Sequence, residues 1–261
     1  MRIVRFTPGP DAGLGQDPLF GVLEDDATIS IISGDPIYSG IQKTAAKIEL
    51  NKVRLLAPII PRSKVVCVGK NYADHAAEMG GVVPDEPIIF LKPNTSVIGP
   101  NDTIVWPDMS ERIDHEAELA IVIGRICKDV PVERVNDVIF GYTIANDVTA
   151  RDIQKKDGQW TRAKGFDTFC PIGPWIDTDF IPGTQKITAT IAGEVKQSAQ
   201  ISDMIFDVPT IVNFVSRVMT LLPGDIILTG TPAGIGPMVA GEKATMAIEG
   251  LGELTNKVSA K

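Results

Sequence analysis

Two glutamates near the middle of the chain stand two residues apart where an apolar run begins. Glu116 and Glu118 lie in the stretch DHEAELAIVIG, residues 114–124. Side chains i and i+2 of a β-strand point to the same face, so both carboxylates would approach the core together. Such a pair repels and loses hydration at a cost of several kcal/mol unless a cation compensates. The pair indicates a divalent cation site, and the alternative is a solvent-facing strand on which glutamate alternates with apolar residues.

A third acid ends the next apolar segment. Asp147 closes the run FGYTIAND, residues 140–147. Three carboxylates form a hard oxygen donor set, which suits Mg²⁺ or Mn²⁺ rather than Zn²⁺. His115 would face away from the glutamates by strand alternation, and we interpret it as structural. We therefore expect Glu116, Glu118 and Asp147 to bind the metal and to leave positions open for water or a chelating substrate.

His75 is the histidine that could do chemistry. Glu78 follows it by three residues, so one helical turn would place the two side chains together. A carboxylate that orients an imidazole makes a general acid–base pair, and the flanking Lys70-Asn71 and Gly80-Gly81 would let this turn move as a lid. The alternative is an ordinary helix surface.

Two further stretches could meet a substrate. Arg151, Arg162 and Lys164 place basic groups among aromatic residues in an otherwise acidic chain, where they could hold an anion or lie on the surface. The glycine-rich stretch LTGTPAGIG, residues 228–236, lacks the G-x-G-x-x-G spacing of a dinucleotide site. We interpret it as a turn whose N–H groups and Thr231 hydroxyl meet a carboxylate, or else as a hairpin turn.

Composition excludes several classes of protein. The 261 residues carry 33 acidic and 25 basic side chains, a net charge of −8, which does not suit a nucleic-acid partner. Hydrophobic residues at 44% and charged residues at 22% are typical of a globular protein rather than a disordered one. The longest apolar stretches fall far short of the roughly 18 residues of a membrane span. With three scattered cysteines and no visible signal peptide, we expect a cytoplasmic protein that binds neither membrane nor nucleic acid.

Short β-branched segments between glycine, proline and aspartate predict a strand-dominated α/β fold. The expected strands are Thr28–Ile32, Lys64–Val68, Ile88–Leu91, Leu119–Ile123, Ile187–Ile191 and Asp225–Leu228. One helix should begin at Asp207 and continue to Pro223-Gly224, and residues 132–138 should form another. The stretch Ala57–Pro61 marks a boundary between a small β-rich N-terminal domain, residues 1–58, and a larger domain, residues 59–261.

Taken together, these motifs resemble the fumarylacetoacetate hydrolase family. The resemblance covers about three-quarters of the chain and is carried by five motifs in the family's order, at Gly69–Glu78, His115–Gly124, Gly141–Asp152, Trp160–Asp167 and Leu222–Gly234. It implies a mixed β-sandwich roll, a homodimer, and Mg²⁺ or Mn²⁺ on Glu116, Glu118 and Asp147. The short first domain is similar to that of the smaller bacterial members.

The resemblance also implies roles for individual residues. His75 and Glu78 would act as a dyad on a mobile lid, and Lys164 would meet the substrate carbonyl or a metal-bound water. The substrate-binding residues would be Lys70, Arg151, Gln154 and Thr231.

The expected reaction is cleavage of the C3–C4 bond of a small 2-oxo acid through a metal-stabilised enolate. Oxaloacetate decarboxylation comes first and acylpyruvate hydrolysis close behind. The alternative is isomerisation of 2-hydroxyhepta-2,4-diene-1,7-dioate, which needs only proton transfer. A more remote alternative is a non-catalytic metal-binding or interaction module.

Overall fold

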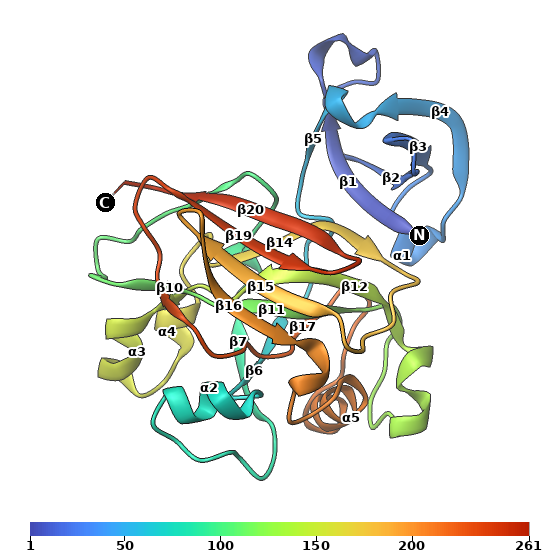
Figure 1. Ribbon diagram of the computed structural model, residues 1–261. Coiled ribbons are helices and arrows are strands. Elements are labelled where there is room, and N and C mark those ends of the chain that lie inside the picture. The colour runs from blue at the N-terminus through green and yellow to red at the C-terminus, as the bar shows by residue number, and fades with distance from the viewer. Residues whose placement is uncertain (261) are drawn as a thin grey trace.

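A computed structural model describes residues 1–260, and β-strands dominate it (Figure 1). The first 58 residues form five of them: β1 (Arg2–Pro8), β2 (Leu19–Leu23), β3 (Thr28–Ile32), β4 (Lys43–Glu49) and β5 (Val53–Leu55). They enclose a small core of Val4, Phe6, Leu23, Ile29, Ile31 and Ile48. Figure 1 shows this part, in blue, to one side of the rest of the molecule. The domain boundary at residue 58 stays a prediction.

The largest sheet runs through the whole molecule in the order β4-β3-β2-β1-β14-β12-β11-β17-β6-β7, with β5 paired to β1 and β8 to β14. Its strands beyond residue 58 are β6 (Val65–Gly69), β7 (Ile88–Lys92), β8 (Val97–Ile98), β11 (Ala117–Ile123), β12 (Ile139–Asn146), β14 (Cys170–Asp177) and β17 (Ile226–Leu228). The first strand joins the sheet by pairing with β14, Ile3 opposite Ile176. The small N-terminal part and the larger part therefore share one hydrogen-bonded sheet.

Two smaller sheets complete the strand content. One has the order β16-β15-β19-β20-β9 and consists of β9 (Thr103–Ile104), β15 (Lys186–Ile191), β16 (Glu194–Gln200), β19 (Lys243–Ile248) and β20 (Gly252–Val258). The other has the order β13-β10-β18 and consists of β10 (Ile113–His115), β13 (Thr149–Ala150) and β18 (Gly236–Pro237).

Strand β11 is buried on both faces. Leu119, Ile121 and Ile123 belong to the main core, which also contains side chains of the five-stranded sheet. Ala120 and Val122 point the other way into a second core. A strand buried on both sides needs a near-continuous apolar sequence, which explains the run from Leu119 to Ile123. The element that carries Glu118 is thus held between two cores.

Helices lie at the edges of this framework: α1 (Pro36–Ser39), α2 (Ala73–Glu78), α3 (Arg151–Asp157), α4 (Thr161–Lys164) and α5 (Val208–Val218). Helix α5 begins as predicted, because the Asp207 side chain accepts a hydrogen bond from the N–H of Thr210 at 2.9 Å. No helix within residues 1–260 is long and apolar enough to span a bilayer.

Two helix predictions need correction. Helix α5 ends at Val218 rather than near Pro223, because the following segment leaves the helix and Leu221 exchanges backbone hydrogen bonds with Cys127 at 3.0 and 2.9 Å. The second predicted helix, residues 132–138, is a 3₁₀-helix over Val132–Asp137.

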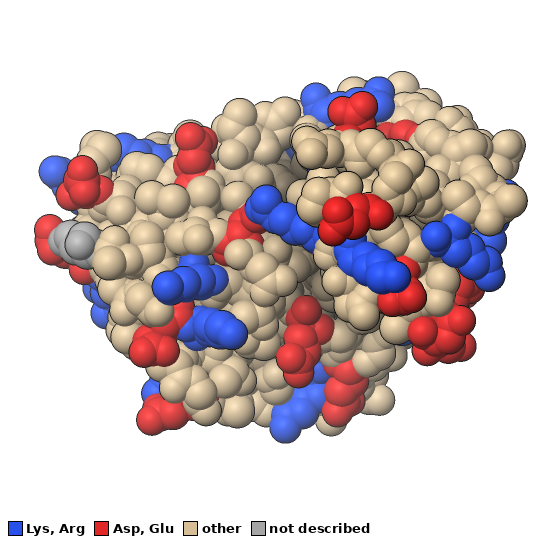
Figure 2. Space-filling view, turned by 90° about the horizontal axis from the view of Figure 1, so that it is seen from above, with Lys and Arg blue, Asp and Glu red and all other residues tan. Residues whose placement is uncertain are grey.

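The predicted strands all have counterparts with bounds within two residues, and the strand-dominated α/β fold is confirmed. Basic and acidic side chains are interspersed on the face shown in Figure 2, so no large patch of one sign covers that face.

Candidate active site

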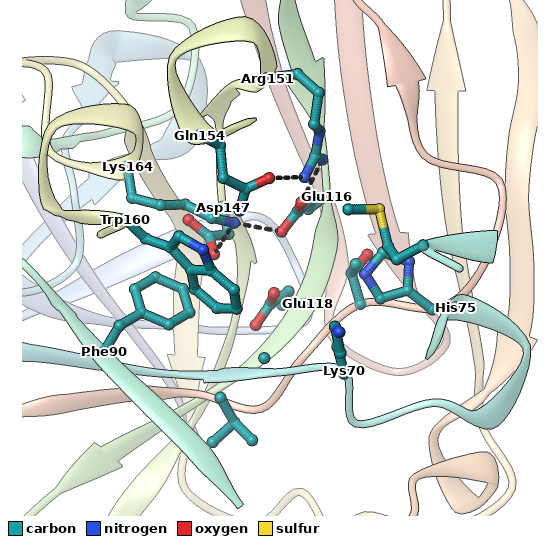
Figure 3. Close-up of a pocket in the computed structure, with 14 residues that line it drawn as sticks. Lys70, His75, Phe90, Glu116, Glu118, Asp147, Arg151, Gln154, Trp160 and Lys164 are labelled. Atoms are coloured by element: carbon teal, nitrogen blue, oxygen red, sulfur yellow. Dashed lines mark hydrogen bonds and ion pairs between the residues drawn. The ribbon is translucent and has the colours of Figure 1, made fainter. Parts of the chain in front are cut away.

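Three buried carboxylates converge where β11 begins and β12 ends. Glu116 lies between β10 and β11, Glu118 is in β11, and Asp147 directly follows β12. Because β11 and β12 are antiparallel neighbours, with Glu118 opposite Ala145, the start of one lies beside the end of the other. One oxygen from each carboxylate lies within 4.8 Å of the others. The three residues are at most 4% exposed, and Figure 3 shows them around one cavity.

Buried cations hold two of the three carboxylates in place. Lys164 Nζ donates to Glu116 Oε2 and to Asp147 Oδ2, both at 2.7 Å. Arg151 Nη2 donates to the other oxygen of Glu116 at 2.6 Å. The ammonium of Lys92 lies behind Asp147, where it pairs with the carboxylate and donates to the carbonyl of Val148 at 3.1 Å.

The third carboxylate is in a different environment. Glu118 accepts the backbone N–H of Gly230 at 2.7 Å and forms no ion pair with any residue that the structure describes. Burial, together with the charges of Asp147 and Glu116, raises the pKa of Glu118 well above its ordinary value.

The pKa of Glu116 moves in the opposite direction. Burial alone would raise it, but Lys164 and Arg151 outweigh burial and hold this pKa below its usual range. Burial would lower the pKa of Lys164, and Asp147 and Glu116 more than reverse that effect. The pKa values of Glu116 and Glu118 are therefore shifted in opposite directions although the two residues belong to one cluster.

The residues fit a divalent cation. All candidate ligands are carboxylate oxygens, the set that Mg²⁺ and Mn²⁺ prefer. Glu118 is buried next to two other acids without a cationic partner of its own, which is costly for an ionised carboxylate. A cation among the three oxygens would remove that cost.

The predicted dyad faces the same cavity from α2. His75 Nδ1 lies 3.2 Å from Glu78 Oε2, and the other oxygen of Glu78 accepts the N–H of Gly234 at 3.1 Å. His75 is 5% exposed and lines the cavity, whereas Glu78 is partly open to solvent. Because Nδ1 is engaged by Glu78, the other ring nitrogen, Nε2, is available to a substrate.

The cavity has one apolar wall. Phe90 and Trp160 pack edge to face with centroids 5.1 Å apart, opposite His75 in Figure 3. A Cβ atom at Gly69 would lie 2.8 Å from the Trp160 ring, so only glycine lets the indole reach this position. The polar groups thus face a small space that is shielded on one side, which suits a small organic acid.

The predicted substrate-binding residues all line the cavity, but they differ in what they already contact. Arg151 Nη1 donates to Gln154 Oε1 at 2.7 Å, and Arg151 Nε donates to Asp114 at 2.9 Å. The Thr231 hydroxyl donates to the carbonyl of Ala117 at 2.9 Å. Lys70 makes no hydrogen bond or ion pair with any described residue.

The glycine-rich stretch is not a hairpin turn, because the strands at its two ends, β17 and β18, belong to different sheets. The predicted contact of its N–H groups with carboxylates is present, whereas the predicted contact of the Thr231 hydroxyl is not. The carboxylates of Glu118 and Glu78 are met by its backbone N–H groups, at Gly230 and Gly234, rather than by the Thr231 hydroxyl. Arg162 does not line the cavity, and it pairs with Asp157 at 2.6 Å on the surface.

Sequence reasoning missed three polar residues that support the site. Lys92 ends an apolar strand immediately before a proline. A charged residue at the end of such a strand could have marked it as a candidate site residue. Asp114, which holds Arg151, stands in the quoted motif beside His115. Gln197, on β16, accepts the N–H of Ala117 at 2.9 Å, and nothing local in the sequence links it to a site 80 residues away.

Comparison with known families decides the relationship. A family model described as the C-terminal part of fumarylacetoacetate (FAA) hydrolase matches residues 64–259. The chain belongs to the fumarylacetoacetate hydrolase family. A second model, described as Rv2993c-like, N-terminal, matches residues 1–58. The resemblance drawn from the five sequence motifs is confirmed, and the protein is an enzyme of this family.

Two curated relatives come from Mycobacterium tuberculosis and Arabidopsis thaliana. Protein Rv2993c of Mycobacterium tuberculosis is 60% identical over 231 residues, which cover 87% of this chain and 85% of that protein. The mitochondrial oxaloacetate tautomerase FAHD1 of Arabidopsis thaliana is 46% identical over 198 residues, which cover 74% of this chain and 89% of that protein.

Two solved structures share the fold over the whole chain. The 2-hydroxyhepta-2,4-diene-1,7-dioate isomerase of Mycobacterium marinum is 49% identical, with a TM-score of 0.90 and coverage of 100% of this chain and 99% of that one. The maleylpyruvate hydrolase of Sphingobium sp. SYK-6, in complex with manganese(II) and pyruvate, is 32% identical, with a TM-score of 0.81 and coverage of 100% and 99%.

Proposed function

We propose that this enzyme catalyses proton transfer at C3 of a small 2-oxo acid such as oxaloacetate, with Mg²⁺ or Mn²⁺ on Glu116, Glu118 and Asp147. The observation that carries the proposal is the convergence of this carboxylate triad and the His75–Glu78 pair on one small cavity. The Arabidopsis oxaloacetate tautomerase supports the substrate, and the M. marinum isomerase supports a proton-transfer reaction.

The cation, when bound, would supply a Lewis acid that favours the enolate form of a 2-oxo acid chelated through its carboxylate and keto oxygens. Lys164 and Arg151 keep Glu116 ionised and fix the direction of its carboxylate. Lys92 forms an ion pair with Asp147 and so fixes the position of that carboxylate. The three cations therefore hold two proposed ligands in position.

His75 is the proposed acid–base group. Glu78 engages Nδ1, so Nε2 can remove a proton from C3 and return it. The N–H of Gly234 fixes the Glu78 carboxylate and thereby the orientation of the imidazole ring. We assign Lys164 a hydrogen bond to the keto oxygen through its remaining N–H, and Gln154, Thr231, Arg151 and Lys70 to the rest of the substrate site.

Cleavage of the C3–C4 bond, which the sequence put first, is the second candidate. The maleylpyruvate hydrolase structure favours it, because that neighbour holds manganese and pyruvate on the same fold. In acylpyruvate hydrolysis, the His75–Glu78 pair would activate a water molecule that attacks the C4 carbonyl. In oxaloacetate decarboxylation, the pair would protonate the enolate that remains after CO₂ leaves.

The test measures proton transfer and decarboxylation of oxaloacetate in the same sample. Protein stripped with EDTA is supplied with Mg²⁺ or Mn²⁺ and oxaloacetate. Enol–keto conversion is followed by ultraviolet absorbance, and pyruvate by lactate dehydrogenase. Acetylpyruvate loss is measured separately. Glu116→Ala is the matched control, because free Mn²⁺ itself decarboxylates oxaloacetate.

Each result has one reading. We expect enol–keto conversion well above the control and with little pyruvate. Pyruvate formed as fast as the enol disappears would favour decarboxylation instead. Loss of acetylpyruvate above the control would favour the hydrolase. No excess over Glu116→Ala in any assay would overturn the proposal.

A homodimer and a cytoplasmic location, both expected from the sequence, belong to the same proposal. Light scattering of the purified protein tests the dimer, for which a mass of twice 28.0 kDa is expected.

A further inference from the structure

We propose that Lys70 binds the distal carboxylate of the substrate, and that this ion pair directs the enzyme toward proton transfer and away from loss of CO₂. The inference rests on the proposed function and assigns Lys70 a specificity-determining role at the same site.

The first argument is that the other cations of the cavity already have their charges paired with carboxylates of the protein. Arg151 donates to Asp114, Glu116 and Gln154. Lys164 donates to two carboxylates at 2.7 Å. Lys70, in contrast, lines the cavity and pairs with none of residues 1–260. The residue is half-buried, and a charge partly withdrawn from water without a partner is costly, so the Lys70 ammonium is the one that a ligand carboxylate would satisfy.

The second argument is the way the backbone places this side chain. Lys70 follows β6 with φ of 56°, in the left-handed region that residues other than glycine seldom adopt. Its Nζ lies against the turn after α2, where a Cβ atom at Gly81 would come within 2.7 Å of it. Strain of this kind persists where surrounding structure enforces it and is frequent at binding sites.

The third argument is the arrangement of the cavity. Lys70 and His75 lie on one side and Phe90 and Trp160 on the other, with Glu118 between them (Figure 3). A 2-oxo acid held at the triad through its carboxylate and keto oxygens and with C3 near His75 would extend its distal end past His75, where Lys70 lies. A distal carboxylate pairs with the ammonium there, whereas an uncharged acyl group leaves it unpaired.

The ion pair has a consequence for the reaction. In proton transfer, the C3–H bond breaks, the proton goes to His75 and the electron pair moves onto the keto oxygen; the distal carboxylate keeps its charge. In decarboxylation, the C3–C4 bond breaks, its electron pair enters the enolate, and C4 leaves as uncharged CO₂. The pair with Lys70 is lost only in the second case, so it raises that barrier selectively.

The first experiment measures pyruvate formed per enol–keto conversion in the presence of Mg²⁺. Lys70→Met removes the charge at nearly constant volume, Lys70→Arg keeps it, and Lys70→Asn removes it with a residue that tolerates positive φ. We expect the ratio to rise about tenfold or more in both neutral variants and to stay near that of the wild type in Lys70→Arg. The exposed Lys155→Met is the matched control. An unchanged ratio in both neutral variants overturns the inference.

The second experiment needs no turnover. Calorimetric titration of the Mg²⁺-loaded protein compares 2-oxoglutarate with 2-oxopentanoate, which lacks the distal carboxylate. We expect the wild type to prefer the dicarboxylate by about tenfold or more, and both neutral variants to lose the preference. A preference kept in Lys70→Met, or none in the wild type, overturns the assignment. If the preference depends on Lys70 but no reaction is detected, the proposed function fails while this carboxylate site stands.

Discussion

The backbone N–H of Gly234 donates to Glu78 at 3.1 Å, across 156 residues of sequence. Four residues earlier in the same turn, the N–H of Gly230 donates to Glu118 at 2.7 Å. One turn thus holds the carboxylate of the proposed dyad and one proposed metal ligand. The triad and the dyad are coupled through backbone rather than through a side chain.

Replacing Gly234 should weaken this coupling. Its φ is 95°, and a Cβ atom there would lie 2.1 Å from the carbonyl oxygen of Lys196. Gly234→Ala must therefore move the turn away from β16, and we expect a loss of about 1–3 kcal/mol in unfolding free energy together with a lower kcat. Gly241→Ala is the control, since φ there is also positive but nothing lies within 4 Å. A loss of kcat equal to that of the control would contradict the coupling.

Gln197 should matter more than its position on an edge strand implies. Its amide oxygen accepts the N–H of Ala117, and its amide nitrogen donates to Thr231 and to the carbonyl of Pro232 at 2.8 and 2.7 Å. Gln197→Ala leaves these buried groups unsatisfied, so we expect a destabilisation of about 2–4 kcal/mol in urea unfolding. Val195→Ala, exposed on the same strand, should change stability by less than about 0.5 kcal/mol. Similar values for the two would show that the network contributes little.

The stability of the metal-free protein should depend on the charge of Glu118. Its pKa is raised in the folded protein above the ordinary 4.5. Below pH 4.5 both the folded and unfolded states hold the proton, so the stabilising contribution is complete there. As the pH rises further, the unfolded chain loses the proton first, and the contribution disappears as the pH passes through the folded pKa.

We therefore compare thermal unfolding of wild type and Glu118→Gln in EDTA from pH 5 to 8. The wild type should lose stability relative to the variant as the pH rises. Mg²⁺ should reverse the trend in the wild type only, because the metal competes with the proton. A constant difference between the two proteins over this range would refute the assignment of the shift to Glu118.

Removal of Lys92 should leave the buried Asp147 carboxylate without one of its cationic partners. Both groups are almost fully buried, and breaking such a pair by removing one partner costs about 3–5 kcal/mol. Lys92→Met should show this loss in EDTA and a smaller one with Mn²⁺ present, because the cation takes over part of the compensation. The measurement is urea unfolding of both proteins in both conditions. Equal losses with and without Mn²⁺ would argue against a metal near Asp147.

The sequence predicts the glutamate pair and the dyad because each depends on a short spacing, whereas Asp147 joins the glutamates through the pairing of β11 with β12. Glu116 and Glu118 are two residues apart, and His75 and Glu78 are one helical turn apart, so local geometry suffices. The supporting groups depend on contacts across the fold. Gln197 reaches Ala117 from another sheet, and strand patterns do not specify which sheets meet.

Helix α5 also shows that local sequence patterns do not specify contacts between distant segments. Its start follows from Asp207 and the apolar spacing, which act locally. Its end depends on the pairing of Leu221 with Cys127, a contact between segments that local periodicity does not encode.

The pairing of β1 with β14 also bears on how the chain behaves in solution. Ile3 and Arg2 occupy the backbone hydrogen-bonding groups of β14 near Ile176 and Asp177. Without residues 1–58, that stretch would become an unpaired strand edge beside apolar side chains, a template for pairing with other copies. The N-terminal part, which supplies none of the residues that line the cavity, would then serve the enzyme by preventing aggregation of the part that does.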